Sequence, residues 1–208
     1  MSFKIALDHI TVAARSLDEG ATYVEAVLGT KLSPGGKHKA MGTHNRVLSL
    51  GPHCYLEAIA VDPEASKPKH RRWFNLDNYS GAPRVTNWVC RTDDLDAALA
   101  AAPSGSGTPM RLTRGDMTWH MGVTDFGRLP YDDAMPALMD WGDSPHPNRR
   151  LPDHGLRLTR LDVFHPRAEE LLKAFPHLGG MPEVSLRVGP EKRLISTIST
   201  PEGNRILA

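Results

Sequence analysis

Short runs of alternating apolar and polar residues recur along the chain, separated by helical spacings and turns. In residues 7–13, Ile10 and Val12 share one face of an expected strand, and His9 and Thr11 share the other. An imidazole in an apolar strand needs a partner, because burying a polar group alone costs about 1–3 kcal/mol. The pattern therefore predicts a strand that carries one side chain with a specific task.

A helix and further strands follow this first strand. Residues 17–28 place apolar side chains at helical spacing, between an expected N-cap at Ser16 and a left-handed C-cap at Gly29. Residues 34–36, Pro-Gly-Gly, predict a turn. Two further strands are expected over residues 45–50 and 55–61. This part of the chain has the order strand, helix, then two or three strands.

The same order restarts in the middle of the chain. Residues 85–91 are an expected strand, and residues 95–102 an expected alanine-rich helix. Aligning the two copies places Asn87 opposite His9. Two further strand-like runs lie at residues 119–124 and 137–141.

A third, reduced copy follows a linker-like run. It has an expected strand over residues 156–164 and an expected helix over residues 166–175. Residues 184–188 and 194–200 then predict a hairpin about Gly189-Pro190. Such repetition argues for duplicated supersecondary units.

Three motifs occur in order in the first copy. They are Leu-Asp-His-Ile at 7–10, the run from Pro34 to Asn45, and Tyr-Leu-Glu-Ala-Ile at 55–59. With the order of elements, they resemble the vicinal oxygen chelate superfamily and, within it, the glyoxalase-like domain group. The resemblance is specific over about residues 5–62 and looser over residues 83–142.

The resemblance implies an α+β fold in which paired βαβββ modules form curved antiparallel sheets around an open cleft. The first module is expected over residues 1–65 and the second over residues 83–143. A partial C-terminal module is expected over residues 155–208. The modules are expected to pack as one glyoxalase-like domain, and related folds also pair modules across a homodimer.

Metal-dependent members of the superfamily place four ligands in the cleft, on the first and last strand of each module. The resemblance puts His9 and Glu57 at the first two positions, Asn87 at the third and Asp140 at the fourth. We therefore expect His9, Glu57 and Asp140 to bind a divalent metal, namely Zn, Ni, Mn or Fe. Glu57 is also the expected catalytic base, since a carboxylate beside a metal can be tuned for proton transfer.

Strand parity gives an independent reason for this placement. In the strand over residues 55–59, Leu56 faces the expected helix and Glu57 faces the cleft. In the last strand of the second copy, Met139 and Trp141 suit the helix side, so Asp140 is expected to face the cleft.

Asn87 leaves the metal site incomplete, because an amide is a poor ligand beside imidazole and carboxylate. His44 and His120 are alternative donors, although neither has a spacing that requires the role. Contacts to the substrate are expected from His44, Asn45, Asn87, Trp119 and His120.

Three functions fit these residues. The first is a metal-dependent enzyme, of the lyase, isomerase or dioxygenase type, acting on a small oxygenated molecule. The second is a metal-free protein that binds or sequesters a small ligand, with His9 hydrogen-bonded to Glu57. The third is a structural or regulatory dimer whose cleft is unused.

Composition narrows the choice of partners and compartment. The 208 residues include 25 basic and 24 acidic side chains, so a formal charge of +1 gives no general attraction to nucleic acid or anionic lipid. The two cysteines have no CxxC spacing and indicate a reducing compartment. No apolar run reaches the ~18 residues of a membrane span. We expect a cytoplasmic protein with a small-molecule partner and no membrane or nucleic-acid partner.

Overall fold

The first module contains a strand, a helix and three further strands. Its elements are β1 (Ile5–Ala13), α1 (Leu17–Leu28), β2 (Ser33–His38), β3 (Thr43–Ser49) and β4 (Tyr55–Val61). As predicted, the Glu19 N–H donates to the Ser16 hydroxyl at 3.2 Å at the start of α1, and Gly29 ends this helix with a φ of 68°. In the computed structural model, which describes residues 3–208, no helix is long and apolar enough to cross a membrane.

The second module repeats this order. Its elements are β5 (Arg84–Thr92), α2 (Leu95–Ala101), β6 (Thr108–Arg114), β7 (Met117–Val123), the short helix α3 (Pro130–Asp133) and β8 (Ala137–Asp140). The 3₁₀ turn η1 (Trp73–Asn78) precedes it, and η2 (Pro147–Arg149) follows it. The alternation does not predict β6, because Met110 and Leu112 are its only large apolar residues apart from a proline. Antiparallel pairing with β7 along the whole of β6 stabilises it as a strand.

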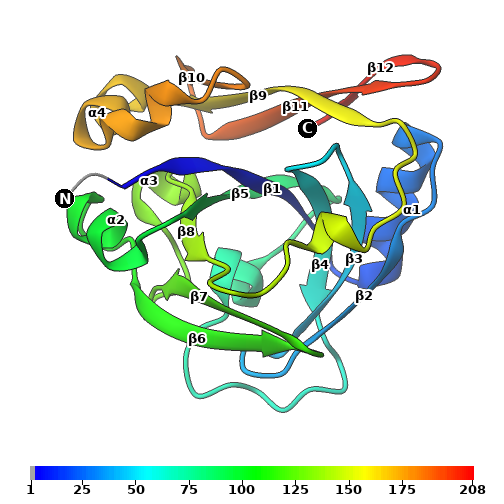
Figure 1. Ribbon diagram of the computed structural model, residues 1–208, viewed down its shortest axis with the longest axis horizontal. Helices are drawn as coiled ribbons and strands as arrows, with labels where there is room; N and C mark the ends of the chain where they lie inside the picture. Colours follow the sequence, from blue (N-terminus) through cyan, green and yellow to red (C-terminus); the bar gives the residue numbers. More distant parts are fainter. Residues whose placement is uncertain (1–2) are drawn as a thin grey trace.

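The two modules share one eight-stranded sheet in the order β2-β3-β4-β1-β5-β8-β7-β6. β1 and β5 pair antiparallel at its centre, while each module's first and last strands pair in parallel. The sheet curls until its edge strands, β2 and β6, contact each other (Figure 1). The predicted α+β fold of paired βαβββ modules around a curved sheet is confirmed.

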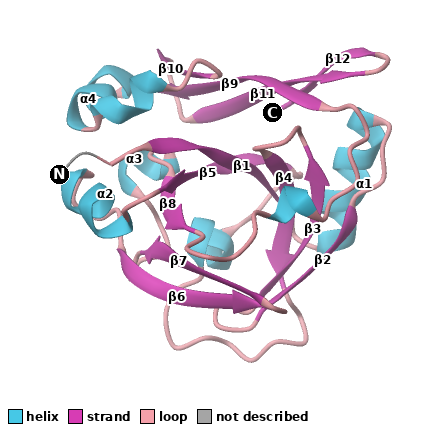
Figure 2. Ribbon diagram, in the orientation of Figure 1, coloured by secondary structure: helices cyan, strands magenta, loops and turns pink. Residues whose placement is uncertain are grey.

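The C-terminal part of the chain forms a second sheet, which lies across β1 and β5 (Figure 2). Its elements are β9 (Arg157–His165), α4 (Ala168–Ala174), the 3₁₀ turn η3 (Pro176–Gly180), β10 (Val184–Val188), β11 (Arg193–Thr200) and β12 (Gly203–Leu207). The predicted hairpin between the last two expected strands is wrong. β9 lies between β10 and β11, parallel to the first and antiparallel to the second, and β11 forms its hairpin with β12.

The prediction of a turn at residues 34–36 is also wrong, because these residues lie within β2. Pro-Gly-Gly is tolerated there because β2 is an edge strand and its register shifts between Pro34 and Lys37.

Two hydrophobic cores lie on opposite faces of the large sheet. Neighbouring residues of β5 divide between them: Trp88 belongs to the outer core and Val89 to the inner one. The outer core also contains Phe175 and fills the space between the two sheets. The inner core includes Trp119 and lies within the curl, where the site is found.

Candidate functional site

A cavity lies inside the curl of the eight-stranded sheet, and both modules contribute to its wall. Four of its lining side chains carry polar chemistry: His9, His38, Glu57 and Arg114. The rest of the wall is formed by aromatic and methionine side chains. The free volume at its centre is about 20 Å³, which is room for one water-sized group. Any ligand can place only a single small group at this centre.

His9 and Glu57 meet in this cavity, as the strand parity of the first module predicts. His9 Nε2 lies 3.7 Å from Glu57 Oε2, and both residues are buried. The His9 ring stacks on Tyr55, with centroids 4.4 Å apart. The parallel pairing of β1 with β4 produces this arrangement, since it sets His9 beside Tyr55 on the same sheet face.

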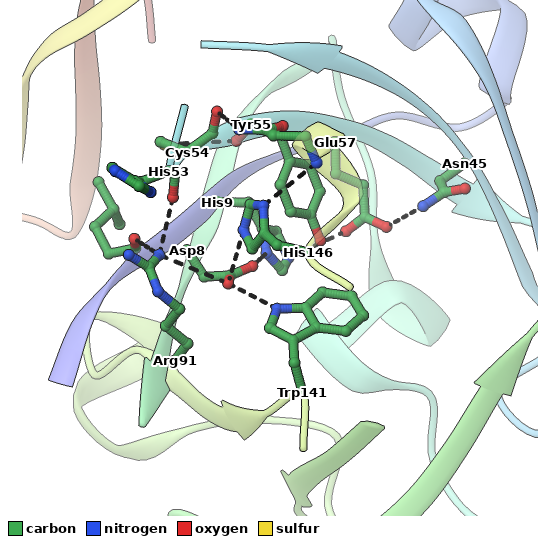
Figure 3. Close-up of polar contacts among 12 residues, drawn as sticks. Asp8, His9, Asn45, His53, Cys54, Tyr55, Glu57, Arg91, Trp141 and His146 are labelled. Carbon is green, nitrogen blue, oxygen red and sulfur yellow. Dashed lines mark hydrogen bonds and ion pairs between the residues drawn. The ribbon is translucent and has the colours of Figure 1, made fainter. Parts of the chain in front are cut away.

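Asp8 fixes the orientation of the His9 ring (Figure 3). It is fully buried, and its Oδ1 lies 2.7 Å from His9 Nδ1. Its Oδ2 accepts the Trp141 indole N–H at 2.9 Å and lies 3.2 Å from His146 Nε2. Burial raises the pKa of Asp8, but the contacts with His146 and His9 outweigh it and hold this pKa well below its usual range.

The charge of Asp8 determines which His9 nitrogen carries a proton. An ionised carboxylate only accepts hydrogen bonds, so His9 Nδ1 must donate to Asp8. His9 Nε2 is left to face Glu57 and the cavity. A carboxylate behind a histidine is also how proteins orient imidazoles for metal binding or proton transfer.

Glu57 is held from the other side by Asn45. The Asn45 side-chain N–H donates to Glu57 Oε1 at 2.5 Å, and Asn45 Oδ1 accepts the Gly36 N–H at 2.8 Å. A Cβ at Gly35 would lie only 2.1 Å from Asn45 Oδ1, which explains why a residue without a side chain stands there. The structure places Asn45 behind Glu57 and outside the cavity lining, so its predicted contact with substrate stays a prediction.

His38 is a cavity residue to which the sequence analysis gives no role. Its Nε2 lies 3.9 Å from Glu57 Oε1, and its Nδ1 lies 3.1 Å from the Thr43 hydroxyl. Burial lowers the pKa of His38 well below its usual range, and nearby Arg114 acts in the same direction, so the imidazole is neutral at physiological pH. The only sequence signal for His38 is its place in the Gly-Gly-Lys-His motif. Because a turn is expected there, the sequence does not predict that the His38 ring points into the cavity.

Asp140 and His120 face away from the cavity. Met139 on β8 and Trp141 directly after β8 line the wall, and Asp140 Oδ1 instead accepts the Gly142 N–H at 2.7 Å. His120 pairs in register with Asp140 and is exposed. The parity assigned to this strand is therefore wrong, and neither side chain is placed to be a ligand here. Trp119, beside His120, lines the cavity.

Asn87 and His44 are also outside the cavity wall. Asn87 is buried at 1% exposure, and its side-chain nitrogen has no partner within residues 3–208. His44 lies next to Asn45 on β3 and is only partly buried. The second-module half of the expected four-ligand site is thus missing.

The remaining donors match a divalent metal by type. Imidazole nitrogens from His9 and His38 and a carboxylate from Glu57 are ligands of Zn²⁺, Ni²⁺, Mn²⁺ and Fe²⁺. As these side chains stand, they approach one another in pairs at 3.7 and 3.9 Å. In the described part of the chain, no group of three or more His, Cys, Asp or Glu has the arrangement of a metal site. The cavity therefore holds suitable donors without a preassembled metal centre.

Comparisons with known proteins agree with the fold. The family model for the glyoxalase-like domain matches residues 7–179. A hypothetical protein from Staphylococcus aureus has a similar structure, with a TM-score of 0.63 and 14% identity over 91% of this chain and 88% of its own. Methylmalonyl-CoA epimerase from Mycobacterium tuberculosis gives a TM-score of 0.43 and 21% identity over 67% of this chain and 89% of its own. No curated protein matches the chain.

Proposed function

Because the chain belongs to the glyoxalase-like domain family, we propose that it is an enzyme that transfers a proton on a small oxygenated molecule, with Glu57 as the base. One observation carries the proposal. Glu57 lines the cavity, its Oε1 is fixed by Asn45, and its Oε2 accepts no hydrogen bond from any residue within 3–208. A buried carboxylate held in this way is oriented to accept a proton from a ligand.

The reaction that suits this geometry is abstraction of a proton from a carbon next to a carbonyl group. The C–H bond breaks, the proton passes to Glu57 Oε2, and the electron pair moves to the carbonyl oxygen to form an enolate. His9, whose ring is fixed by Asp8, faces the same space and stabilises the oxygen when Nε2 carries a proton. Return of the proton to the same or a neighbouring carbon completes an isomerisation.

A divalent metal is the second candidate for the group that stabilises this oxygen. His9 Nε2 and Glu57 Oε2 face each other at 3.7 Å, and neither carries a hydrogen when His9 is neutral and Glu57 ionised. Two acceptors in this position favour a cation between them. His9, Glu57 and His38 would hold the metal, which when bound would supply Lewis-acid polarisation of the substrate oxygen.

Proton exchange in D₂O tests the proposed reaction without knowledge of the natural substrate. A panel of small hydroxyketones, 2-oxo acids and 2-hydroxy acids is incubated with the protein, and loss of carbon-bound ¹H signal is followed by NMR. We expect exchange on at least one compound with the wild-type protein. Glu57→Gln should abolish it, whereas Glu202→Gln, at an exposed residue, should not.

The same assay distinguishes the two candidates for the group that stabilises the substrate oxygen, namely His9 and a divalent metal. Protein stripped with a chelator is assayed alone and after addition of Zn²⁺, Ni²⁺, Mn²⁺ or Fe²⁺. Exchange that needs an added ion, together with about one bound ion per chain that His9→Ala removes, supports the metal. Exchange at full rate in the stripped protein rejects it, and no exchange under any condition rejects the enzyme and favours a ligand-binding protein.

A further inference from the structure

We propose that the ligand of this cavity is a small organic carboxylate and that Arg114 binds its carboxylate group. The inference rests on the proposed function and specifies its substrate class. Arg114 is the last residue of β6, is only 8% exposed, and lines the inner cavity together with Glu57. It also lines a groove on the outside of the cavity, so its side chain stands between the two spaces.

The guanidinium of Arg114 lacks a partner. Among residues 3–208 it makes no ion pair and no side-chain hydrogen bond. The other buried arginine, Arg72, is equally covered but pairs with Asp77 at 2.6 Å and donates to the Gly42 carbonyl. None of its nitrogens is among the fully buried, unpartnered polar atoms of residues 3–208, so the guanidinium keeps access to the open spaces that it lines. A mostly buried charge without a protein partner is expected where a ligand supplies the opposite charge.

A second donor in the same wall is also without an acceptor. The Trp73 indole nitrogen is buried and has no hydrogen-bond partner in the described chain. The indoles of Trp88 and Trp141, in contrast, donate to the Ala134 carbonyl and to Asp8, each at 2.9 Å. This second unmatched donor belongs to a residue of the same wall, although its nitrogen is itself fully covered.

The contact between β2 and β6 holds Arg114 at this position. A Cβ at Gly36 would lie 2.9 Å from Arg114 Cγ and 3.0 Å from its Cδ. The glycine therefore leaves the space that the arginine stem occupies. Gly35 and Gly36 thus serve two sides of the site, since the first makes room for Asn45 and the second for Arg114.

The sizes and linings of the two spaces on either side of Arg114 indicate the size and polarity of the rest of the ligand. The inner space of about 20 Å³ admits one oxygen-sized group beside His9 and Glu57. The outer groove has a free volume of about 410 Å³, and Val47, Met117 and Leu151 give it apolar surface. A carboxylate on Arg114, an oxygen on the neighbouring carbon and a short aliphatic chain in the groove would occupy all three places.

A pair of probes that differ only in charge tests this assignment. 2-Hydroxyhexanoate and 2-hydroxyhexanamide are titrated into the full chain by calorimetry, with tryptophan fluorescence as a second signal. We expect the acid to bind at least about tenfold more tightly than the amide, as a charge-assisted contact to Arg114 requires. Equal binding of the two probes, or binding of neither, would overturn the inference.

Variants assign the preference to one side chain. Arg114→Gln should reduce the preference to within about threefold, and Gly36→Ala, which displaces the arginine stem, should reduce it as well. Arg167→Gln is the matched control, because Arg167 is exposed, pairs with Glu170 at 2.8 Å and lines neither the cavity nor the groove. A tenfold preference that survives both Arg114→Gln and Gly36→Ala in folded protein would contradict the proposal.

Glu57→Gln distinguishes this inference from the proposed function. The variant should lose proton exchange and keep its preference for the acid, because Glu57 is not the group that binds the carboxylate. Proton exchange by the wild-type protein on neutral hydroxyketones, without any preference for acids, would reject the carboxylate and leave the base in place.

Discussion

Individual side chains of the site are held in place by residues behind them. Asp8 orients His9, and Asn45 orients Glu57, so each of these two cavity side chains has one partner outside the cavity lining. Positions fixed in this way lose less freedom when a ligand binds. The sequence motifs contain both partners: Asp8 directly precedes His9, whereas Asn45 ends the run that begins with Pro34 and lies 12 residues before Glu57.

Removing the charge of Asp8 should change the pH dependence of stability. Its pKa in the folded protein lies below the unfolded value of about 3.9, so its contribution is present above that pH and is lost as the pH falls below it. We expect Asp8→Asn to lower the free energy of unfolding by about 1–3 kcal/mol at pH 7. The difference from wild type should shrink below pH ~4 in denaturant titrations.

Asp125→Asn, at an exposed aspartate, is the control for this experiment and should match wild type at every pH. A difference between Asp8→Asn and wild type that stays constant from pH 7 to pH 3 would refute the role given to the charge.

Asn45→Ala should damage both stability and catalysis. The change leaves Glu57 Oε1 and the Gly36 N–H without their partner, at a cost of about 1–3 kcal/mol. Urea unfolding measures this loss, and the D₂O assay should show slower exchange because Glu57 is no longer oriented. The exposed Asn204→Ala variant should change neither. Wild-type exchange in Asn45→Ala would show that Glu57 needs no such support.

The elements differ in how far their sequences predict them. Ile10 and Val12 of β1 pack in the outer core, so alternation over residues 9–12 gives the inward position of His9, whereas the pairing with β5 shifts between Leu7 and His9. β8 is apolar on both faces, because Leu138 packs in the outer core and Met139 in the inner one. Alternation cannot distinguish the faces of such a strand, and for this reason it predicts the wrong side for Asp140.

β2 is a strand that the local sequence does not predict. Its Pro-Gly-Gly run has the composition of a turn, and only the pairing with β3 and the contact with β6 make it a strand. The inward position of His38 depends on that pairing, so the local sequence does not show it.

Adding one methyl group to β2 should therefore disrupt the site. In Gly35→Ala the new Cβ would approach Asn45 Oδ1 to 2.1 Å and the Asn45 carbonyl oxygen to 2.5 Å, so the two strands must move apart. We expect a loss of about 1–3 kcal/mol in thermal or urea unfolding and weaker ligand binding. Gly180→Ala is the matched control, because nothing lies within 4 Å of its Cβ. Equal stability of the two variants would contradict the claim that Gly35 is required for the close approach of β2 to Asn45.

At the scale of the whole molecule, the C-terminal sheet and the large sheet share one hydrophobic core. Residues such as Phe175 and Leu161 belong to the same cluster as Ile10 and Trp88. The repeat predicts a third strand–helix–strand unit, and its elements are present, but the sequence does not show that this unit covers β1 and β5. The homodimer and the cytoplasmic location stay predictions.

Phe175→Ala should reveal whether the two sheets unfold together. Phe175 is fully buried, and its truncation should cost about 3–5 kcal/mol. All four tryptophans lie in the part of the chain before residue 142, so their fluorescence reports on the large sheet. We expect the fluorescence and circular dichroism transitions to shift equally. An unshifted fluorescence transition would show that the C-terminal sheet unfolds on its own.

The role of Glu57 as the base in the cavity is tested most directly by one rate ratio. Proton exchange in D₂O is measured by NMR for wild type and for folded Glu57→Gln, on the panel compound that the wild-type protein exchanges fastest. Loss of a general base predicts that the wild-type rate exceeds the variant rate by about 10²–10⁴. Equal rates in the two proteins, or no exchange above the buffer rate on any compound, would contradict it.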